Sequence, residues 1–286
     1  MVKWLANRVA IVTGSGQGIG RAIALTLSKE GAHVITNSRK PGTPGGDAEI
    51  TANEIRLSGG QAFAFFGDVS KWESCQELAK FAISKFGDID ILVTNAGITI
   101  DELFINTSKE DFDLMIDINL KGQFNCLQAV LPHMISKKYG RIITISSGAS
   151  LGTTQGEVAY GATKAAVVCM TQGLALEVKD YGVTVNTLMP VAKTRLSLHS
   201  VSKMGVGVTK LTTGLGINQT PESNAPIVAF LAGERTGKIT GRIFTRRFEG
   251  TIQVLNNGSA RGIYKEGIWT VNEIEKVVGQ LLPDLL

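Results

Sequence analysis

Val9-Ala-Ile-Val-Thr-Gly-Ser-Gly-Gln-Gly-Ile-Gly20 is the stretch that decides the fold. Its first four residues are continuously apolar, which is typical of a strand buried on both faces of a parallel sheet. Glycines follow at once, and a helix is predicted from Ile19 to Glu30. A strand, a glycine-rich turn and a helix start in this order place free N–H groups and the helix dipole where a pyrophosphate binds.

The glycines of this turn, Gly14, Gly18 and Gly20, have the spacing TGxxxGxG and not GxGxxG. A tight turn that needs a positive φ is the structural alternative. The strand before the glycines and the helix after them favour nucleotide binding. The expected cofactor contacts in this turn are Gly14, Ser15, Gln17, Gly18, Ile19 and Gly20.

Outward from the turn, short apolar runs alternate with longer amphipathic stretches. Strands separated by helices form βαβ units with right-handed crossovers. The sequence therefore predicts an α/β fold, a single Rossmann-type doubly wound parallel sheet with helices on both faces. The predicted strands are 9–12, 33–37, 61–66, 89–94, 141–146 and 183–188, and the predicted helices are 19–30, 48–58, 71–86, 109–136, 157–180 and 271–282.

Three segments do not follow this alternation of strands and helices: residues 40–47, residues 194–220 and the C-terminal residues 246–286. Residues 40–47 form a loop, and residues 194–220 are rich in Gly, Thr, Ser and Lys. A loop as long as the second one is usually functional, so we expect a lid there. No linker divides the chain. We expect one catalytic domain over residues 1–245 and a C-terminal extension, residues 246–286, packed on or beside it.

The composition excludes several classes of protein. The chain has 286 residues, a net charge of +4, 19% charged residues and 43% hydrophobic residues, which argues against a disordered chain or a strongly basic nucleic-acid binder. Cys75, Cys126 and Cys169 are odd in number and far apart, and no histidine has a zinc-like spacing with them, so we expect neither a disulfide framework nor a metal. No run reaches the roughly 18 apolar residues of a membrane helix. We therefore expect a cytoplasmic protein that binds neither nucleic acid nor membrane.

The second strand indicates which nicotinamide is bound. An acidic residue there would bond the ribose 2′-OH of NAD, but residues 33–40 contain no carboxylate. Ser38 can donate a hydrogen bond to a 2′-phosphate, and Arg39 can hold the phosphate through a charge-assisted fork. The alternative is that Arg39 and Lys40 are solvated loop charges. The pattern favours NADP(H) over NAD(H).

Tyr160 and Lys164 stand at an i, i+4 spacing on a predicted helix, which puts both side chains on one face. Free tyrosine has a pKa near 10, and a nearby ammonium lowers that pKa by stabilising the phenolate. Thirteen residues before Tyr160, Ser147 ends a predicted strand, so its hydroxyl faces the crevice where ligands bind in such sheets. Ser146 is the competing serine. Taken alone, Tyr-x-x-x-Lys is usually an ordinary pair on a helix surface.

Together these pieces resemble the short-chain dehydrogenase/reductase family, in its classical subgroup, over roughly residues 5–245. The matching pieces are Thr13-Gly-x-x-x-Gly-Ile-Gly20, Asp68-Val69, Asn95-Ala-Gly97, Asn119, Ser147, Tyr160-x-x-x-Lys164 and Asn186 to Pro190. The resemblance implies hydride transfer between nicotinamide C4 and a carbonyl or carbinol carbon of a small-molecule substrate. It also implies a homotetramer, with a homodimer as the alternative.

The resemblance implies a role for each matching residue. Tyr160 would be the general acid in reduction and the general base in oxidation, while Lys164 would bond the nicotinamide ribose and tune Tyr160. Ser147 would hold the substrate oxygen. Asn119 would support a water-linked proton relay to Lys164, although it could also be a satisfied core amide at a helix bend.

Further cofactor contacts are implied at other strand ends. Asp68 and Val69 would contact adenine, with a helix N-cap as the alternative for Asp68. Residues 95–97 would contact the cofactor through the backbone or simply stabilise the sheet. The full set beyond the glycine turn is Ser38, Arg39, Asp68, Val69, Asn95, Ala96, Gly97, Tyr160, Lys164, Pro190 and Thr194.

Two segments narrow the substrate class. Residues 186–197 lack the Pro-Gly of most relatives and look more like the hydroxyacyl-CoA dehydrogenase part of peroxisomal multifunctional β-oxidation proteins, as does segment 264–274. Those relatives carry an Asp where Ser38 stands, and they use NAD. The resemblance therefore supports the substrate class more than the cofactor.

The leading hypothesis is an NADP(H)-dependent reductase of 3-oxoacyl thioesters, linked to CoA or to an acyl-carrier protein. Basic residues bordering the expected lid would either meet thioester phosphates or be solvated; these are Lys193, Arg195, Lys203 and Lys210. A cyclic ketone, steroid or xenobiotic carbonyl is the alternative substrate. A catalytically silent NADP(H)-sensing protein is the alternative of another class, against which the presence of all four tetrad residues argues.

Overall fold

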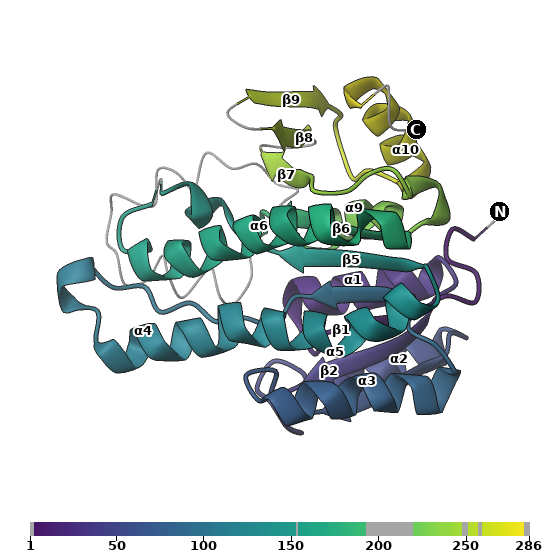
Figure 1. Cartoon of the computed structure of the whole chain (residues 1–286), viewed down its shortest axis with the longest axis horizontal. Helices are drawn as coiled ribbons and strands as arrows, with labels where there is room; N and C mark the ends of the chain where they lie inside the picture. The colour runs from purple at the N-terminus through teal and green to yellow at the C-terminus, as the bar shows by residue number, and fades with distance from the viewer. Residues whose placement is uncertain (1–2, 153, 193–219, 248–250, 257–258, 283–286) are drawn as a thin grey trace.

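The computed structural model describes residues 3–152, 154–192, 220–247, 251–256 and 259–282. One nine-stranded sheet runs through the molecule in the order β3-β2-β1-β4-β5-β6-β7-β8-β9. In Figure 1 helices α5 and α6 lie in front of the sheet and α1 lies behind it. The predicted doubly wound α/β fold, with helices on both faces of a largely parallel sheet, is confirmed.

The strands and helices have the following bounds. The strands are β1 (Val9–Val12), β2 (His33–Ser38), β3 (Ala62–Phe66), β4 (Ile91–Thr94), β5 (Gly140–Ile145), β6 (Val183–Met189), β7 (Ile243–Arg247), β8 (Thr251–Asn256) and β9 (Ser259–Tyr264). The helices are α1 (Gly18–Lys29), α2 (Ala48–Leu57), α3 (Trp72–Phe86), α4 (Lys109–Met115), α5 (Gly122–Ser136), α6 (Val158–Val178), α9 (Ala225–Leu231) and α10 (Val271–Leu281).

Strand β1 lies at the centre of the fold because it pairs in parallel with β2 on one side and β4 on the other. Its side chains alternate between two hydrophobic cores. Ala10 and Val12 pack in the core that contains α1 and α9, and Ile11 packs in the core that contains α3 and α5. Both faces are covered, which is why the run is apolar without alternation. The strand order reverses beside β1, where such sheets bind ligands at their carboxyl ends.

The C-terminal part of the chain continues the sheet, which the sequence did not predict. Strand β7 pairs in parallel with β6, and β8 and β9 follow in antiparallel. The expected boundary between residues 245 and 246 lies inside β7. Strand β7 ends in two arginines and every residue of α9 is buried, so neither element shows the periodicity of a half-exposed strand or helix.

The single helix predicted over 109–136 is interrupted. Helices α4 and α5 are joined by the π-helical turn Ile116–Lys121, which contains Asn119. The turn spans only 6 residues, too few for its different period to stand out in the sequence pattern. Such turns occur often at functional sites.

Among the described residues, no helix combines the length and the apolar character needed to cross a bilayer. All three cysteines are free thiols, and the Sγ atoms of buried Cys75 and Cys126 lie 3.6 Å apart. No group of His, Cys, Asp and Glu side chains in the described ranges could hold a metal ion.

Candidate active site

The glycine turn after β1 is pressed against the end of β4. The Asn95 side-chain amide donates to the carbonyl oxygens of Thr13 and Gly14, both at 3.0 Å. Gly14 has a φ of +62°, and a Cβ on it would lie 2.8 Å from Ala96 Cα. A Cβ on Gly20 would lie 2.4 Å from Asn95 Nδ2. The glycines therefore allow a close backbone approach that no larger residue could make.

Helix α1 begins at this turn with its amides open. Gln17 stands at the N-cap without a side-chain hydrogen bond to the helix, and the first turn contains no acidic residue. Free N–H groups at a helix N-terminus favour an anion. The turn and the helix start therefore fit the pyrophosphate of a dinucleotide.

Ser15 lies in the turn, but its polar groups are all engaged. Its hydroxyl donates to Val12 O at 2.8 Å and accepts from Asn37 N at 2.9 Å, and the residue is completely buried. Its N–H donates to Asn37 O, and its carbonyl accepts from Thr51. Ser15 therefore fixes the shape of the turn.

The end of β2 is tied to the loop that follows it. The Ser38 hydroxyl accepts from Ala48 N at 3.0 Å and donates only weakly to Lys40 O, at 3.5 Å. Asp47 accepts from Gly42 N at 2.7 Å, and backbone hydrogen bonds hold the pKa of this carboxyl below its usual value. Arg39 is exposed and forms no ion pair with a described residue. Its guanidinium is therefore open to a ligand at this strand end.

Ser147 and Tyr160 come together at the end of β5. Ser147 is partly exposed, accepts from Ala149 N at 3.2 Å and is hydrogen-bonded to the Tyr160 side chain. Ser146, in contrast, is buried and donates to Lys164 O at 2.8 Å inside the fold. Of the two serines, only Ser147 is placed to touch both Tyr160 and a ligand.

The pKa of Tyr160 differs from the sequence expectation. Burial raises it to about 12, the hydrogen bond with Ser147 lowers it, and the charges of Glu157 and Asp101 raise it further. The expected lowering by Lys164 is absent. The Lys164 ammonium lies 5.7 Å from the centre of the phenol ring, and burial lowers its own pKa to about 8. At neutral pH the Tyr160 phenol is therefore protonated and can donate its proton.

Lys164 has hydrogen-bonding capacity to spare. Its side chain is 3% exposed, and its Nζ donates to Ile145 O at 3.0 Å. An ammonium carries three donors, and no other acceptor for them occurs among the described residues. Two free donors in a buried position fit the neighbouring hydroxyls of a ribose. This orphaned group and the open start of α1 together fit a nicotinamide dinucleotide.

Asn119 and Lys164 both face Gly97. A Cβ on Gly97 would lie 3.1 Å from Asn119 Oδ1 and 3.4 Å from Lys164 Nζ. The Asn119 amide accepts from Ile98 N at 2.8 Å and donates to Ile98 O at 2.9 Å and Thr163 Oγ1 at 3.2 Å. Its side chain is thus a satisfied core amide that joins the π-helical turn to the end of β4 and to α6.

The remaining predicted contacts lie at other strand ends. Asp68 accepts from the backbone N–H and the hydroxyl of Ser70, at 2.9 and 2.8 Å. Val69 is buried against Gly122, where a Cβ would lie 2.8 Å from Val69 Cγ2. Pro190 follows β6 and is partly exposed. The predicted contact Thr194, the basic residues Lys193, Arg195, Lys203 and Lys210, and nearly all of the expected lid 194–220 lie outside the described residues.

Four residues near the site were not among the predicted site residues. The Thr13 hydroxyl accepts from the N–H groups of Asn95 and Ala96, at 3.0 and 3.1 Å. Asn37, Asp101 and Glu157 complete the set. Glu157 precedes Tyr160 by three residues, a helical spacing that could have revealed it. Asp101 comes close because Glu102 N donates to Gly156 O at 3.0 Å, which no local pattern shows.

Known proteins share this architecture and sequence. The short chain dehydrogenase family matches residues 8–203. A 3-oxoacyl-(acyl-carrier-protein) reductase of Staphylococcus epidermidis is 36% identical over 250 residues, which is 82% of this chain and 96% of that protein. The peroxisomal multifunctional enzyme type 2 of Drosophila melanogaster is 36% identical over 80% of this chain, which spans only 37% of that enzyme.

A solved structure extends the likeness to the whole chain. The crystal structure of a short chain dehydrogenase from Mycobacterium avium aligns with a TM-score of 0.77 and 34% identity, over 99% of this chain and 97% of that one. That coverage includes β8, β9 and α10. The family match and the identities confirm the resemblance seen in the sequence. The chain belongs to the short chain dehydrogenase family and is an oxidoreductase that acts on CH–OH and carbonyl groups.

Proposed function

We propose that this protein is an NADP(H)-dependent reductase of 3-oxoacyl thioesters. The observation that carries the proposal is that Ser147 and the Tyr160 phenol lie together beside Lys164, a buried ammonium with one acceptor among the described residues. A bound nicotinamide supplies the hydride in reduction and accepts it in oxidation. The residues of the chain hold the reactants and move the proton.

Each member of the tetrad has a proposed role. Ser147 donates a hydrogen bond to the substrate oxygen, and Tyr160 gives its phenolic proton to that oxygen as the carbonyl is reduced. Lys164 holds the ribose hydroxyls. When its free donors are engaged in this way, its positive charge tunes the pKa of the Tyr160 phenol. Asn119 fixes the backbone at Ile98 and supports the water-linked relay to Lys164.

The choice of substrate rests on the relatives and on the surface beside the tetrad. The staphylococcal relatives are reductases of 3-oxoacyl-(acyl-carrier-protein). Exposed apolar side chains stand on the two segments that the Glu102–Gly156 hydrogen bond joins, and they would suit an acyl chain. These side chains are Leu103, Phe104, Leu151 and Val158. A cyclic ketone, steroid or xenobiotic carbonyl would use the same apolar surface and is the second candidate substrate.

The choice of NADP(H) rests on the end of β2. Arg39 is exposed there and free of any described ion pair, while Asp47 is already satisfied by backbone amides. A guanidinium without a competing carboxylate favours a 2′-phosphate. We propose that the other cofactor contacts are those predicted at the glycine turn, apart from the fully buried Ser15, and at the ends of β3, β4 and β6.

The test follows the absorbance of the reduced nicotinamide at 340 nm with acetoacetyl-CoA, in parallel with NADPH and NADH. We expect rapid turnover that is selective for NADPH. Tyr160→Phe should lower it by about 10²–10⁴-fold, whereas Tyr181→Phe, which alters a phenol 45% exposed and distant in sequence, should leave it unchanged. Arg39→Ala should weaken the binding of NADPH and leave the binding of NADH unchanged.

Four outcomes would redirect the proposal. Turnover with NADH alone would keep the reaction and reject the cofactor choice. Turnover of free ketones but not of thioesters would favour the second candidate substrate. A Tyr160→Phe protein with full turnover would reject this site as the catalytic one, and no turnover on any carbonyl would favour the silent NADP(H)-sensing alternative.

We further propose that residues 1–245 form the catalytic domain and residues 246–286 an extension, and that the protein acts in the cytoplasm.

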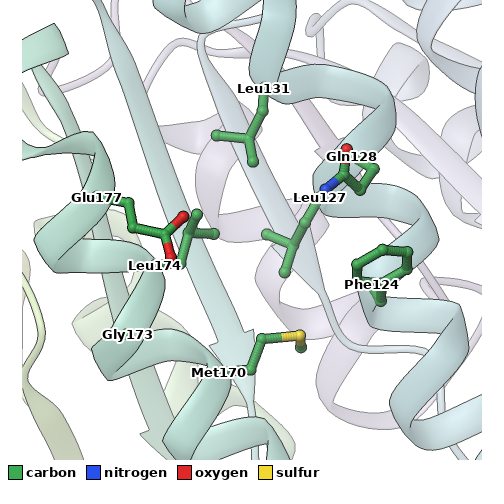
Figure 2. A pocket seen from close by; sticks show the side chains of 8 residues that line it. All are labelled: Phe124, Leu127, Gln128, Leu131, Met170, Gly173, Leu174 and Glu177. Atoms are coloured by element: carbon green, nitrogen blue, oxygen red, sulfur yellow. The ribbon is translucent and has the colours of Figure 1, made fainter.

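We also propose that the protein acts as a homotetramer or homodimer. A groove between α5 and α6 supports self-association (Figure 2). It is lined by Phe124, Leu127, Gln128, Leu131, Met170, Gly173, Leu174 and Glu177. Light scattering on the wild type and on Leu174→Glu tests this: the variant should have the lower mass.

A further inference from the structure

Arg246 stands at the carboxyl end of β7, at the edge of the sheet where the tetrad lies. Its neighbour Thr245 pairs with Met189 of β6, and the Thr245 hydroxyl donates to Met189 O at 3.0 Å. Arg246 is therefore level with the first residues of the loop after β6. Asn224 pins that loop by accepting from Val191 N at 3.1 Å and donating to Val191 O at 3.0 Å.

The side chain of Arg246 lies on the same face of the sheet as α1. Arg246 pairs across the antiparallel ladder with Ile252, and directly opposed residues share a face. Ile252 is fully buried in the core that also contains the residues of α1 and α9. The open N-terminus of α1 and the arginine therefore belong to one face and one edge of the sheet.

This arginine is buried, and the part of the chain that the structure describes offers it no partner. Arg246 is 3% exposed, its Nε has no hydrogen-bond acceptor, and its guanidinium forms no ion pair with any described residue. Burial lowers its pKa, and no neighbouring charge contributes. Arg141 is also 3% exposed, but its guanidinium donates to four carbonyl oxygens, those of Gly140, Gly182, Gly233 and Glu234.

A buried charge without a counter-charge or acceptor destabilises the fold, because the water it has lost is not replaced. An anion that reached the guanidinium would remove this penalty. The planar fork of an arginine matches the oxygens of a phosphate in a bidentate arrangement. A chain that buries an arginine in this state gains stability on binding the anion.

We propose that Arg246 anchors an anion-binding subsite at the carboxyl end of β7, which takes a phosphate or pyrophosphate group. Such a group can come from the dinucleotide or from the carrier of a thioester substrate. The subsite does not depend on the substrate proposed above, because its test measures stability and binding and not turnover.

The test compares the wild type with Arg246→Met in thermal unfolding, first without ligand and then with inorganic pyrophosphate. The variant without ligand should melt at least about 2 °C above the wild type, because the unpaired charge is gone. Pyrophosphate should raise the melting temperature of the wild type and leave that of the variant unchanged. Arg235→Met is the matched control, since Arg235 is 71% exposed and pairs with Glu275; it should keep both wild-type values.

NADP+ and CoA then separate the two sources of the phosphate. The ligand whose stabilising effect is lost in Arg246→Met is the one that the subsite holds. An Arg246→Met protein that melts below the wild type would show that the guanidinium is already neutralised within the chain, and this would overturn the proposal. So would an equal response to pyrophosphate in wild type and variant.

Discussion

Buried charged groups are satisfied at one end of the parallel strands and unsatisfied at the other. We call these two ends the amino edge and the carboxyl edge of the sheet. At the amino edge, the guanidinium of Arg141 is bonded to four carbonyl oxygens, and Asp90 accepts from Lys137 at 2.7 Å, Arg8 at 3.2 Å and Val9 N at 2.8 Å. At the carboxyl edge, Lys164 has one described acceptor and the buried Nε of Arg246 has no described acceptor.

The difference separates stability from function. A satisfied buried charge holds segments of the chain together, whereas a buried cation with free donors is costly until a ligand arrives. Among the described residues the amino edge has two exceptions, the hydroxyls of Thr184 and Tyr139, which are buried without a partner; the Tyr139 ring also contacts the guanidinium groups of Arg8 and Arg141. Both hydroxyls are neutral, so each carries a smaller penalty than a bare cation.

The largest effect should come from removing the catalytic groups of the carboxyl edge. Tyr160→Phe and Lys164→Met should each lower the turnover by about 10²–10⁴-fold. Their melting temperatures should equal or exceed that of the wild type, because each change removes a buried polar group that is incompletely satisfied. Steady-state rates and thermal unfolding measured on the same samples test both statements. A Lys164→Met protein that unfolds several degrees earlier would break the comparison of the two edges.

Arg141→Met should have the reverse effect. Four carbonyl oxygens of three separate segments lose their donor, which should cost about 3 kcal/mol of stability or more. The turnover per folded molecule should stay close to that of the wild type, because Arg141 lies far from the tetrad along the strands. Urea unfolding and rates at low temperature measure the two quantities. Loss of activity in a fully folded variant would show that the two edges are coupled.

Asp47 tests whether a charge at the carboxyl edge can be purely structural. Its carboxylate caps α2 through Ile50 N at 3.1 Å and holds Gly42 N, so Asp47→Ala should cost about 1 kcal/mol at pH 7. Because its folded pKa lies below the usual value of 3.8, this stability is present above that value and is lost as the pH falls through the folded pKa. The difference between wild type and variant in urea unfolding should therefore shrink below about pH 4. Asp47→Asn, which keeps an acceptor, is the control.

The smallest effect should come from Glu157→Gln. The Glu157 charge raises the pKa of Tyr160 and so opposes the phenolate that alcohol oxidation needs. Its removal should move the pH profile of oxidation to lower pH and raise the oxidation rate at neutral pH by about twofold. The reduction rate at neutral pH should hardly change, since the phenol is already protonated. Initial rates measured in both directions from about pH 6 to about pH 10 test this. An unchanged pH profile of oxidation would show that Glu157 does not influence the pKa of Tyr160.

The sequence predicted the fold well wherever a strand or helix shows its own period. Strands β1 to β6 and helices α1 to α3 follow from apolar runs and turn residues. The edge strands β7 to β9 and helix α9 could not be found this way. Their assignment depends on partners far along the chain, such as β6 for β7, and α9 is short and buried all round.

For the site, the sequence supplied the identities of the residues but not the directions of their side chains. The spacing of Tyr160 and Lys164 suggested that the ammonium lowers the phenol's pKa, yet Lys164 is bonded to Ile145 O and burial dominates. No pattern in the sequence singled out Arg246. Only the register of β7 against β6 and β8 shows that it is buried.

The position of β9 also determines how the molecule meets other chains. Strand β9 is the last in the sheet order, so its outer backbone groups pair with no described strand. Exposed strand edges can recruit a further strand and nucleate aggregation. Without residues 251–264 this edge would pass to β7, where Phe244 is now fully buried. Because β8 and β9 extend the sheet, the edge strand that could recruit another chain lies away from the catalytic part of the sheet.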